Sequence, residues 1–123
     1  MLLRKYRLVK STDFRHANKE GQSWSDRLIV LCKAPNDLPL SRFGFSVSRH
    51  IGKATVRNRA RRLMREAVRL QLDLISPGWD VVLIARRGMV GASYWAVERS
   101  VTRLLSLASL RRAEAGADRD EVE

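Results

Sequence analysis

The spacing of hydrophobic residues along the chain changes from a period of two to a period of about 3.6 near residue 52. Before that point, Phe43, Phe45 and Val47 alternate with glycine and serine residues. Such alternation is typical of a β-strand with one bulky face and one small, polar face. We therefore predict a strand over residues 42–48, and its small face could admit a ligand.

Two further segments are rich in residues that favour strands. Residues 27–33 are separated from residues 42–48 by the turn-forming segment 34–39, so we expect these two strands to form an antiparallel pair. Residues 79–86 contain an uninterrupted apolar run, which is typical of a strand covered on both faces. This third strand is expected to be central in the sheet or well covered.

Helical spacing and capping residues predict three helices. Ser11 or Thr12 can cap a short helix of about two turns that stops near Gly21. Residues 53–75 form the longest predicted helix, and residues 93–112 form the last. The apolar stripe of the longest helix consists of Val56, Ala60, Leu63, Met64, Ala67, Leu70 and Leu74.

The chain has the length of one domain, since compact domains usually hold about 100 to 150 residues and this chain has 123. No Pro-rich or Gly-rich linker divides it. Five of its 13 acidic residues and one of its 24 basic residues fall within residues 113–123, so that segment carries −4 and residues 1–112 carry +15. We predict a single RNA-binding α/β domain over residues 1–112, followed by an acidic, disordered tail over residues 113–123.

The apolar runs are short. None exceeds five residues, whereas a membrane-spanning helix needs roughly 20. The N-terminus is basic, and no apolar segment of the signal-peptide type follows its charges. We therefore expect a cytoplasmic protein without a membrane span.

Positive charge is the strongest feature of the composition. Lys and Arg number 24 against 13 Asp and Glu, which gives a net charge of +11, and arginine outnumbers lysine by 19 to 5. A guanidinium group binds phosphate oxygens in pairs and stacks on bases. A GC-rich coding bias would also favour arginine over lysine, but it does not explain the net charge. Nucleic acid is therefore the expected partner.

The basic residues are densest between residues 49 and 69, where eight bases accompany a single acid, Glu66. Four arginines of the predicted helix form a row at intervals of four residues, expected to face away from the apolar stripe. Like charges at this spacing repel by about a few tenths of a kcal/mol per pair, and phosphate groups along the row would remove that cost. The alternative is an incidental basic face. The row consists of Arg57, Arg61, Arg65 and Arg69.

Residues for protein-based catalysis are not evident. A nuclease acting by itself would need grouped carboxylates for a metal ion, or a general acid and base. The carboxylates form no metal-binding cluster in the sequence, although folding could still gather some of them. We expect His16 and His50 at surface or phosphate-contacting positions, and Cys32 has no neighbours that would activate its thiolate. We therefore predict no catalytic residue and no metal site in this chain.

A family resemblance is carried by residues 43–66, which read FGFSVSRHIGKATVRNRARRLMRE. This segment resembles the signature of the bacterial ribonuclease P protein component. The specific feature is the combination of a strand, then Gly52 and Lys53, then the Arg-Asn-Arg sequence at residues 57–59 with further bases after it. Less sharply, the resemblance extends over about residues 4–110.

The resemblance implies an α+β fold. The expected form is a two-layer α/β sandwich with a small, mainly antiparallel sheet, three helices and a left-handed βαβ crossover, like the second domain of a ribosomal protein. Left-handed crossovers are rare.

The resemblance also implies the function of a protein subunit of ribonuclease P. Such a subunit binds the catalytic RNA and the 5′ leader of precursor tRNA and assists endonucleolytic removal of the leader. Catalysis is expected from the RNA subunit with Mg²⁺, no cofactor from the protein alone, and no obligate protein partner. The alternative is another structured-RNA-binding module, such as a ribosomal protein or an RNA chaperone, which would show the same charge.

The residues that match the family motif and the basic row give the expected RNA-binding set: Arg49, Lys53, Arg57, Asn58, Arg59, Arg61, Arg62, Arg65 and Arg69. The leader-binding cleft implied by the resemblance comprises Phe14, Asn18, Cys32, Ser46, Arg61 and Arg65. Two of these positions depart from the family pattern, since the family usually has an aromatic or apolar residue at Asn18 and often an aromatic residue at Cys32. Stacking on leader bases is therefore expected to be weaker or differently placed.

Overall fold

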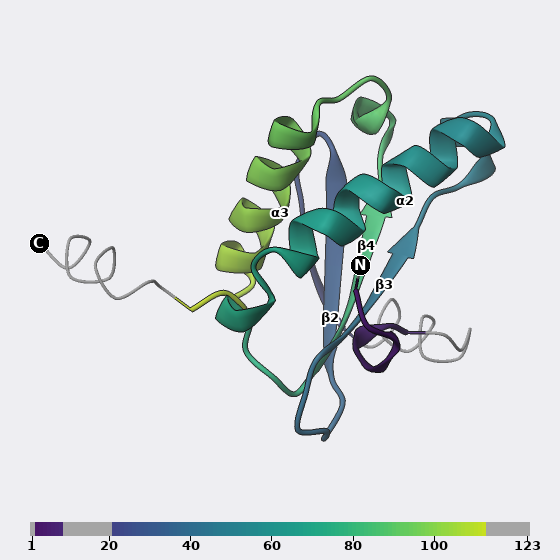
Figure 1. The fold of residues 1–123 in the computed structure, drawn as a ribbon. Coiled ribbons are helices and arrows are strands. Elements are labelled where there is room, and N and C mark those ends of the chain that lie inside the picture. The colour runs from purple at the N-terminus through teal and green to yellow at the C-terminus, as the bar shows by residue number, and fades with distance from the viewer. Residues whose placement is uncertain (1, 9–20, 113–123) are drawn as a thin grey trace, which may run out of the picture.

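The computed structural model describes residues 2–8 and 21–112 of the chain. Two helices lie on one side of a sheet, so the described part has two layers (Figure 1). The strands are β1 (Gln22–Ser25), β2 (Ile29–Pro35), β3 (Arg42–Ser46) and β4 (Trp79–Ala85). The helices are α2 (Ala54–Arg69) and α3 (Tyr94–Leu107), with four short 3₁₀ helices, η1 (Arg4–Tyr6), η2 (Arg49–Ile51), η3 (Leu72–Leu74) and η4 (Arg87–Met89).

The four strands form one mixed sheet in the order β1-β2-β4-β3. β1 pairs with β2 and β2 pairs with β4 in the antiparallel sense, whereas β3 and β4 are parallel. The expected α+β class is therefore confirmed, and so is the central position of the strand at residues 79–86. β1 was not predicted from the sequence.

The expected pairing of the strands at residues 27–33 and 42–48 is wrong, because β4 lies between β2 and β3. The physical reason is burial. The residues Val81, Val82 and Leu83 are fully buried, so both faces of β4 are covered, and a strand of this kind is most stable with a neighbour on each side. The segment after β2 is therefore a connection to the far edge of the sheet and not a hairpin.

The hydrophobic core lies between the sheet and the two helices. α2 contributes Ala60, Met64, Ala67 and Val68, which are spaced as one face of a helix. α3 contributes a similar buried face. From the sheet, the buried core residues include Leu31, Phe43, Val81 and Leu83. The opposite sides of α2 and α3 are left facing outward.

The long helix is shorter than the sequence predicts. α2 ends at Arg69 and is followed by η3, and the side chain of Leu70 is 61% exposed instead of joining the apolar stripe. The chain turns here because Gln71 is buried and its side-chain amide donates hydrogen bonds to the carbonyl of Ala67 and the hydroxyl of Thr102. These bonds hold the end of α2 against α3.

The last helix begins as predicted. The Ser93 hydroxyl accepts a hydrogen bond from the backbone N–H of Ala96, at 3.1 Å, and caps α3. α3 ends at Leu107 and not near residue 112. Ser109 has a φ of 59°, and this left-handed residue lets the N–H of Leu110 bond back to the carbonyl of Leu105.

Three expectations remain: the short first helix, the acidic tail and the absence of a membrane span. The short helix after Ser11 or Thr12 and the tail at residues 113–123 lie outside the described residues. Within residues 2–8 and 21–112, none of the helices is both long and apolar enough for a membrane span.

Candidate RNA-binding surface

The start of α2 is set by a turn that brings cationic residues together. The Ser48 hydroxyl accepts a hydrogen bond from the backbone N–H of His50 at the start of η2. Gly52 then has a φ of 155°, which a residue with a side chain rarely adopts. Lys53 occupies the N-cap of α2 and is exposed. The turn therefore places Arg49 and Lys53 at the end of the helix that carries the other bases.

Three predicted arginines lie along the flank of α2 that faces β3. Arg57 donates a hydrogen bond from Nε to the carbonyl of Gly52 at 3.1 Å, and Arg61 donates one from Nη1 to the side-chain oxygen of Asn58 at 3.2 Å. The guanidinium carbon of Arg65 lies 5.9 Å from the centroid of the Phe45 ring. In addition, Nε of Arg65 is buried and has no hydrogen-bond partner in the structure.

The expectation that this arginine row faces away from the apolar stripe is met only in part, because its four members, Arg57, Arg61, Arg65 and Arg69, are all partly exposed. A row with a spacing of four residues turns by about 40° per step around the helix axis. The row therefore begins beside the buried face at Arg57 and reaches the outer face only at Arg69. The most exposed members of the expected set on this helix are Asn58 and Arg62.

Two further arginines of the expected set already have protein partners. Arg59 donates a hydrogen bond from Nη2 to the carbonyl of Ala92 at 3.0 Å, which links α2 to the segment before α3. Arg69 forms an ion pair with Glu66. The hydrogen bond from Arg69 lowers the pKa of the Glu66 carboxyl. The charge of Arg69 is thus locally balanced, and Arg69 is the least available cation of the set.

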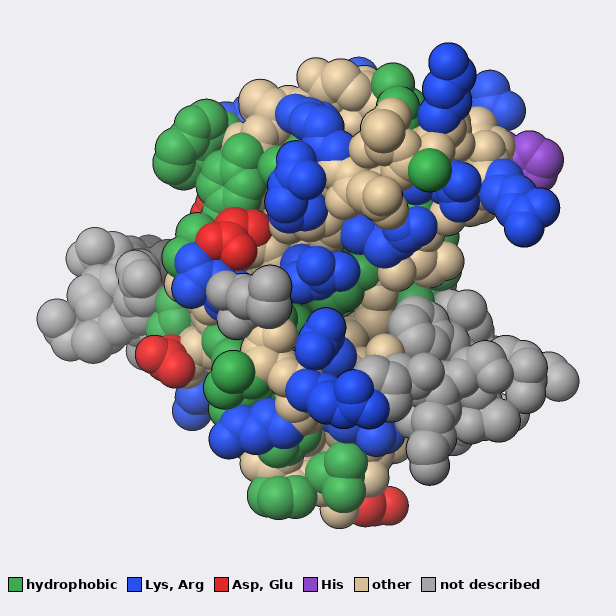
Figure 2. Space-filling model, turned by 45° about the vertical axis from the view of Figure 1, so that its right-hand side comes forward, with side chains coloured by type: hydrophobic (Ala, Val, Ile, Leu, Met, Phe, Trp, Pro, Cys, Tyr) green, Lys and Arg blue, Asp and Glu red, His purple; other side chains and the backbone are tan. Residues whose placement is uncertain are grey.

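We use the term α2 surface for the exposed and partly exposed residues Arg49, Lys53, Arg57, Asn58, Arg59, Arg61, Arg62 and Arg65. Lys and Arg side chains spread over the side of the molecule shown in Figure 2, with few acidic side chains among them. Concentrated positive potential of this kind attracts a polyanion. Eight such residues within 17 positions can engage several phosphate groups at once.

The outer face of the sheet, opposite the helices, carries small side chains on β2 and β3 beside the apolar side chains of Val82 and Ile84 on β4. Residues paired across neighbouring strands point to the same face of a sheet. Cys32 and Gly44 both pair with Val82, and Ser46 pairs with Ile84, two positions farther along β4. Cys32 and Ser46 therefore share this face, which confirms the small second face predicted for the strand at residues 42–48.

Cys32 has no sign of thiolate chemistry. Its side chain is buried, and burial raises the pKa of the thiol. Cys32 is thus a buried residue of β2 with a small side chain.

The structure does not gather the four described residues of the expected leader cleft into one pocket. Arg61 and Arg65 belong to the helix layer, whereas Cys32 and Ser46 lie on the outer face of the sheet. β3 is an edge strand of the sheet and separates the two groups. Phe14 and Asn18 lie outside the described residues.

Arg7 is a candidate that the sequence did not single out. It forms an isolated parallel bridge with Phe43, on the free edge of β3. Its partly exposed side chain has a buried Nε without a hydrogen-bond partner, as Arg65 has. Because bridge partners point to the same face, Arg7 lies on the helix side of the sheet, as Phe43 does. The only signal in the sequence was the basic character of residues 4–7.

The described residues contain no group of three or more His, Cys, Asp and Glu side chains placed to hold a metal ion. His50 is exposed on η2. Asp26 and Asp80, the most buried carboxylates with printed contacts, bind backbone and side-chain groups of the protein itself. The described part of the chain thus offers a cationic surface for binding and no grouped acids.

A small α+β domain with a cationic helix face has the electrostatic properties expected of a nucleic-acid-binding protein. The family model described as "Ribonuclease P" matches residues 2–109. The chain therefore belongs to the ribonuclease P protein family.

Similar proteins agree with this assignment. The ribonuclease P protein component of Herpetosiphon aurantiacus is 42% identical over 107 residues, which is 87% of each chain. The Clostridium kluyveri protein of the same name is 41% identical over 85% of this chain and 96% of its own. Among solved structures, the RNase P protein of Staphylococcus aureus has a TM-score of 0.81 at 29% identity and covers 87% of this chain and 98% of its own. The RNase P protein of Thermotoga maritima has a TM-score of 0.76 at 33% identity and covers 82% of this chain and 96% of its own.

As a member of this family, the chain is the accessory protein subunit of ribonuclease P, the endoribonuclease that matures the 5′ end of tRNA. Its partner is the ribonuclease P RNA. The resemblance found in residues 43–66 is confirmed, and the alternatives of a ribosomal protein or an RNA chaperone are not supported.

Proposed function

We propose that the α2 surface binds the ribonuclease P RNA, and that the outer face of the sheet beside β3 receives the 5′ leader of precursor tRNA. The observation that carries the first part is the charge of the α2 surface. Its two exposed members on the helix, Asn58 and Arg62, have free donors for phosphate oxygens. The partly exposed arginines on either side extend this surface around the helix.

The proposed path of the leader follows from the shape of the outer face. Ser46 on β3 is partly exposed, and its small side chain leaves room for a strand of RNA at this end of β3, whereas Gly44 is buried. Arg61 and Arg65 lie on α2, which packs against β3. A leader that leaves the outer face at Ser46 would therefore meet these guanidinium groups at the edge of the sheet. Phe14 and Asn18 stay predictions for the same cleft.

We further propose that the RNA subunit and its Mg²⁺ carry out the hydrolysis. Mg²⁺ prefers oxygen ligands such as carboxylates and phosphates. RNA supplies phosphates in abundance, whereas the described residues of this chain offer no grouped carboxylates. The protein then acts by binding and by neutralising charge, with no cofactor of its own and no second protein required.

Two finer features complete the proposal. The path from β3 through α2 to β4 is left-handed in our assignment, and Figure 1 supports it: both strands run upward, α2 lies in front of the sheet, and β4 lies to the left of β3.

A protein that works on precursor tRNA together with the ribonuclease P RNA is expected in the cytoplasm.

The leader proposal is tested with the assembled holoenzyme. Ser46→Leu adds bulk to the outer face of the sheet without a change in charge, and Ser106→Leu, at an exposed position of α3, is the matched control. We expect Ser46→Leu to weaken binding of precursor tRNA about tenfold, the scale of one lost base contact. Binding of mature tRNA, which has no leader, should not change.

The comparison of the two substrates decides the outcome. A selective loss for precursor tRNA supports the leader site, provided that Ser106→Leu binds both substrates normally. Equal affinity losses for both substrates, or no loss for either, would contradict it.

A further inference from the structure

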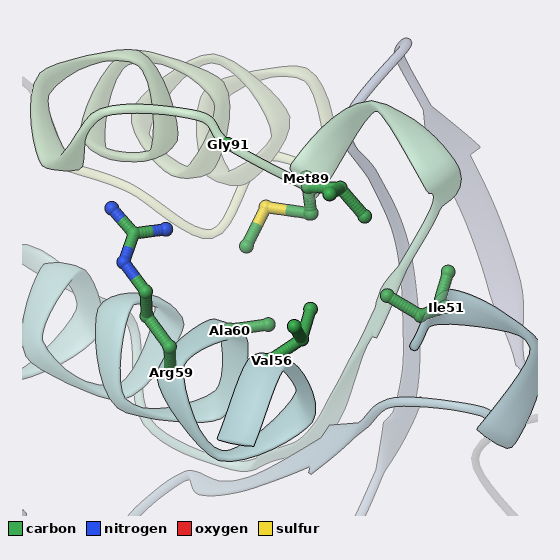
Figure 3. Close-up of a pocket in the computed structure, with 7 residues that line it drawn as sticks. Ile51, Val56, Arg59, Ala60, Met89 and Gly91 are labelled. Carbon is green, nitrogen blue, oxygen red and sulfur yellow. The ribbon is translucent and has the colours of Figure 1, made fainter. Parts of the chain in front are cut away.

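A hollow opens between the first turns of α2 and the segment that follows β4. Figure 3 shows Val56 and Ala60 of α2 on one side, Met89 and Gly91 on the other, Ile51 at one end and Arg59 at the other end. Val90 completes the lining. The hollow has a volume of about 190 Å³.

The walls of this hollow are apolar and held in place by the fold. Met89 and Ala60 are buried, with exposed fractions of 1% and 4%. The hydrogen bond from Arg59 to the carbonyl of Ala92 spans the end of the hollow and fixes the guanidinium group there. A guanidinium group has five N–H donors, and this bond uses only one of its nitrogen atoms. Arg59 can therefore bind a further acceptor at the end of the hollow.

The size of the hollow limits what can fill it. Sites for drug-sized ligands and cofactors usually measure about 300–1,000 Å³. A volume of about 190 Å³ is smaller, and it suits a single flat ring system with one apolar face against each wall. The hollow is therefore too small for a cofactor of that size.

The charge around the hollow identifies the class of occupant. All lining residues come from residues 49–65 and 81–97. These two segments contain nine Lys and Arg residues and no Asp or Glu. Seven of the nine, including Arg59, belong to the α2 surface. The other two are Arg86, which directly follows β4, and Arg87, the first residue of η4. An apolar hollow with Arg59 at one end, next to the cations of the α2 surface, is complementary to a flat ring whose flanking groups are anions.

We propose that this hollow binds one unpaired base of the ribonuclease P RNA. The base would lie against Val56 and Val90, which line the hollow and are accessible at its opening, Arg59 would donate to it or to its phosphate, and the cations of η2 and η4 would bind the phosphates on either side. This inference rests on the proposed binding of the RNA by the α2 surface. It adds a contact with a base to a surface that otherwise offers contacts with phosphates.

The test fills the hollow without a change in charge. Val56→Phe places a ring in the space of the base, and Leu107→Phe, at a 56% exposed position of α3, is the matched control. Affinity for a bacterial ribonuclease P RNA is measured as a function of salt concentration, together with the melting temperature of each protein. We expect Val56→Phe to bind about tenfold more weakly, with the same salt dependence as the unmodified protein, and Leu107→Phe to bind normally.

The salt dependence separates this inference from the proposal on which it rests. Unchanged affinity of Val56→Phe, with a steep salt dependence, would overturn the base contact and leave the α2 surface in place. A salt dependence near zero for the unmodified protein would instead remove the α2 surface.

A second measurement covers the case in which Val56→Phe does not fold. Val90 is 52% exposed at the edge of the hollow, and the native Cys32 is buried. Val90→Cys can therefore carry a photo-crosslinker, with Leu107→Cys as the control. Crosslinking of Val90→Cys to one unpaired nucleotide supports the inference. Crosslinks to helical RNA only, or none above those of Leu107→Cys, would overturn it.

Discussion

At the scale of single residues, Asp80 connects three segments of the chain. Its carboxylate accepts hydrogen bonds from Nε and Nη2 of Arg42 at 2.9 and 2.7 Å, and from Nδ2 of Asn36 at 2.9 Å. The side chain of Asp80 is only 4% exposed, whereas that of Arg42 is 27% exposed. The pair holds β3 beside β4 at the row where both strands begin to run together.

We predict that Arg42→Met is strongly destabilising, because it leaves the Asp80 carboxylate buried without its main cationic partner. Loss of one member of a buried ion pair usually costs about 3–5 kcal/mol. The double variant Arg42→Met/Asp80→Leu removes both charges and should regain much of this loss. Urea unfolding of the unmodified protein, the single variant and the double variant measures the free energy of unfolding of each. Equal destabilisation of the single and double variants would show that the buried charge is not the cause.

The carboxyl group of Asp26 makes the stability of the protein depend on pH. Its carboxylate accepts hydrogen bonds from the backbone N–H groups of Leu28 and Ile29 and from the Ser100 hydroxyl, and Arg103 lies 3.4 Å away. Burial by itself raises the pKa of Asp26, but the hydrogen bonds and Arg103 outweigh it, so the pKa falls below its ordinary value of 3.8. As the pH decreases, the unfolded chain takes up this proton first.

We therefore predict that the stabilisation from Asp26 is complete above the unfolded pKa and is lost as the pH falls through the lower folded pKa. At neutral pH, Asp26→Asn should reduce the free energy of unfolding by about 1.5–3 kcal/mol, the usual range for hydrogen bonds to a charged group. The difference in the free energy of unfolding between Asp26→Asn and the unmodified protein should shrink as the pH falls below the ordinary pKa of the carboxyl group. Thermal melts across a pH series measure it. A difference that stays constant down to pH 2 (roughly two units below that pKa) would contradict the prediction.

At the scale of elements, α2 combines a structural face and a binding face. The four buried residues of its inner side anchor it to the sheet and α3. Positions on the outer side need not pack, so they can carry cations. The structure also ranks these cations, because Arg62 is exposed while Arg69 is paired with Glu66.

We predict that Arg62→Ala changes the salt dependence of RNA binding more than Arg69→Ala does. Each phosphate contact contributes roughly 0.7–0.9 to the slope of log affinity against log salt concentration. Arg62→Ala should therefore flatten the slope by about that amount, whereas the charge of Arg69 is already balanced by Glu66. Both variants lower the net charge equally, so they control for each other. Equal changes in slope would mean that net charge, and not the individual contact, governs binding.

At the scale of the whole molecule, the two layers present different surfaces. The helix layer supplies the cationic α2 surface, and the sheet supplies a small-residue face on the opposite side. A net charge of +11 on 123 residues lowers the repulsion between a catalytic RNA and a tRNA substrate. We therefore expect the protein to replace part of the cation requirement of the RNA.

We predict that the protein alone does not cleave precursor tRNA, and that it lowers the Mg²⁺ concentration at which a ribonuclease P RNA does. Cleavage is measured with protein alone, RNA alone and both together, over a series of Mg²⁺ concentrations. Leu107→Phe serves as a control that should retain this effect, since its position is exposed on α3 away from the α2 surface. Cleavage at the mature 5′ end by repurified protein alone would contradict the prediction.

The sequence by itself determined the features that depend on local order along the chain. Alternation around Phe43 and Phe45 identified β3, helical spacing after Gly52 identified α2, and the Ser93 cap marked the start of α3. The family was also readable from residues 43–66, because a strand, a turn and a cationic helix must occur there in fixed order. Each of these signals comes from residues that lie close together in the sequence.

Only the tertiary structure decided which distant segments meet. The position of β4 between β2 and β3 depends on covering both of its faces, a condition that local pattern does not encode. The same holds for the end of α2, which the buried Gln71 sets through contacts with α3, and for the pairing of Arg59 with Ala92. The hollow beside Arg59 exists only because η4 packs over the start of α2, so residues about 30 positions apart line it together. Long-range packing, and not local preference, therefore decided which cations of this protein are exposed and where the hollow forms.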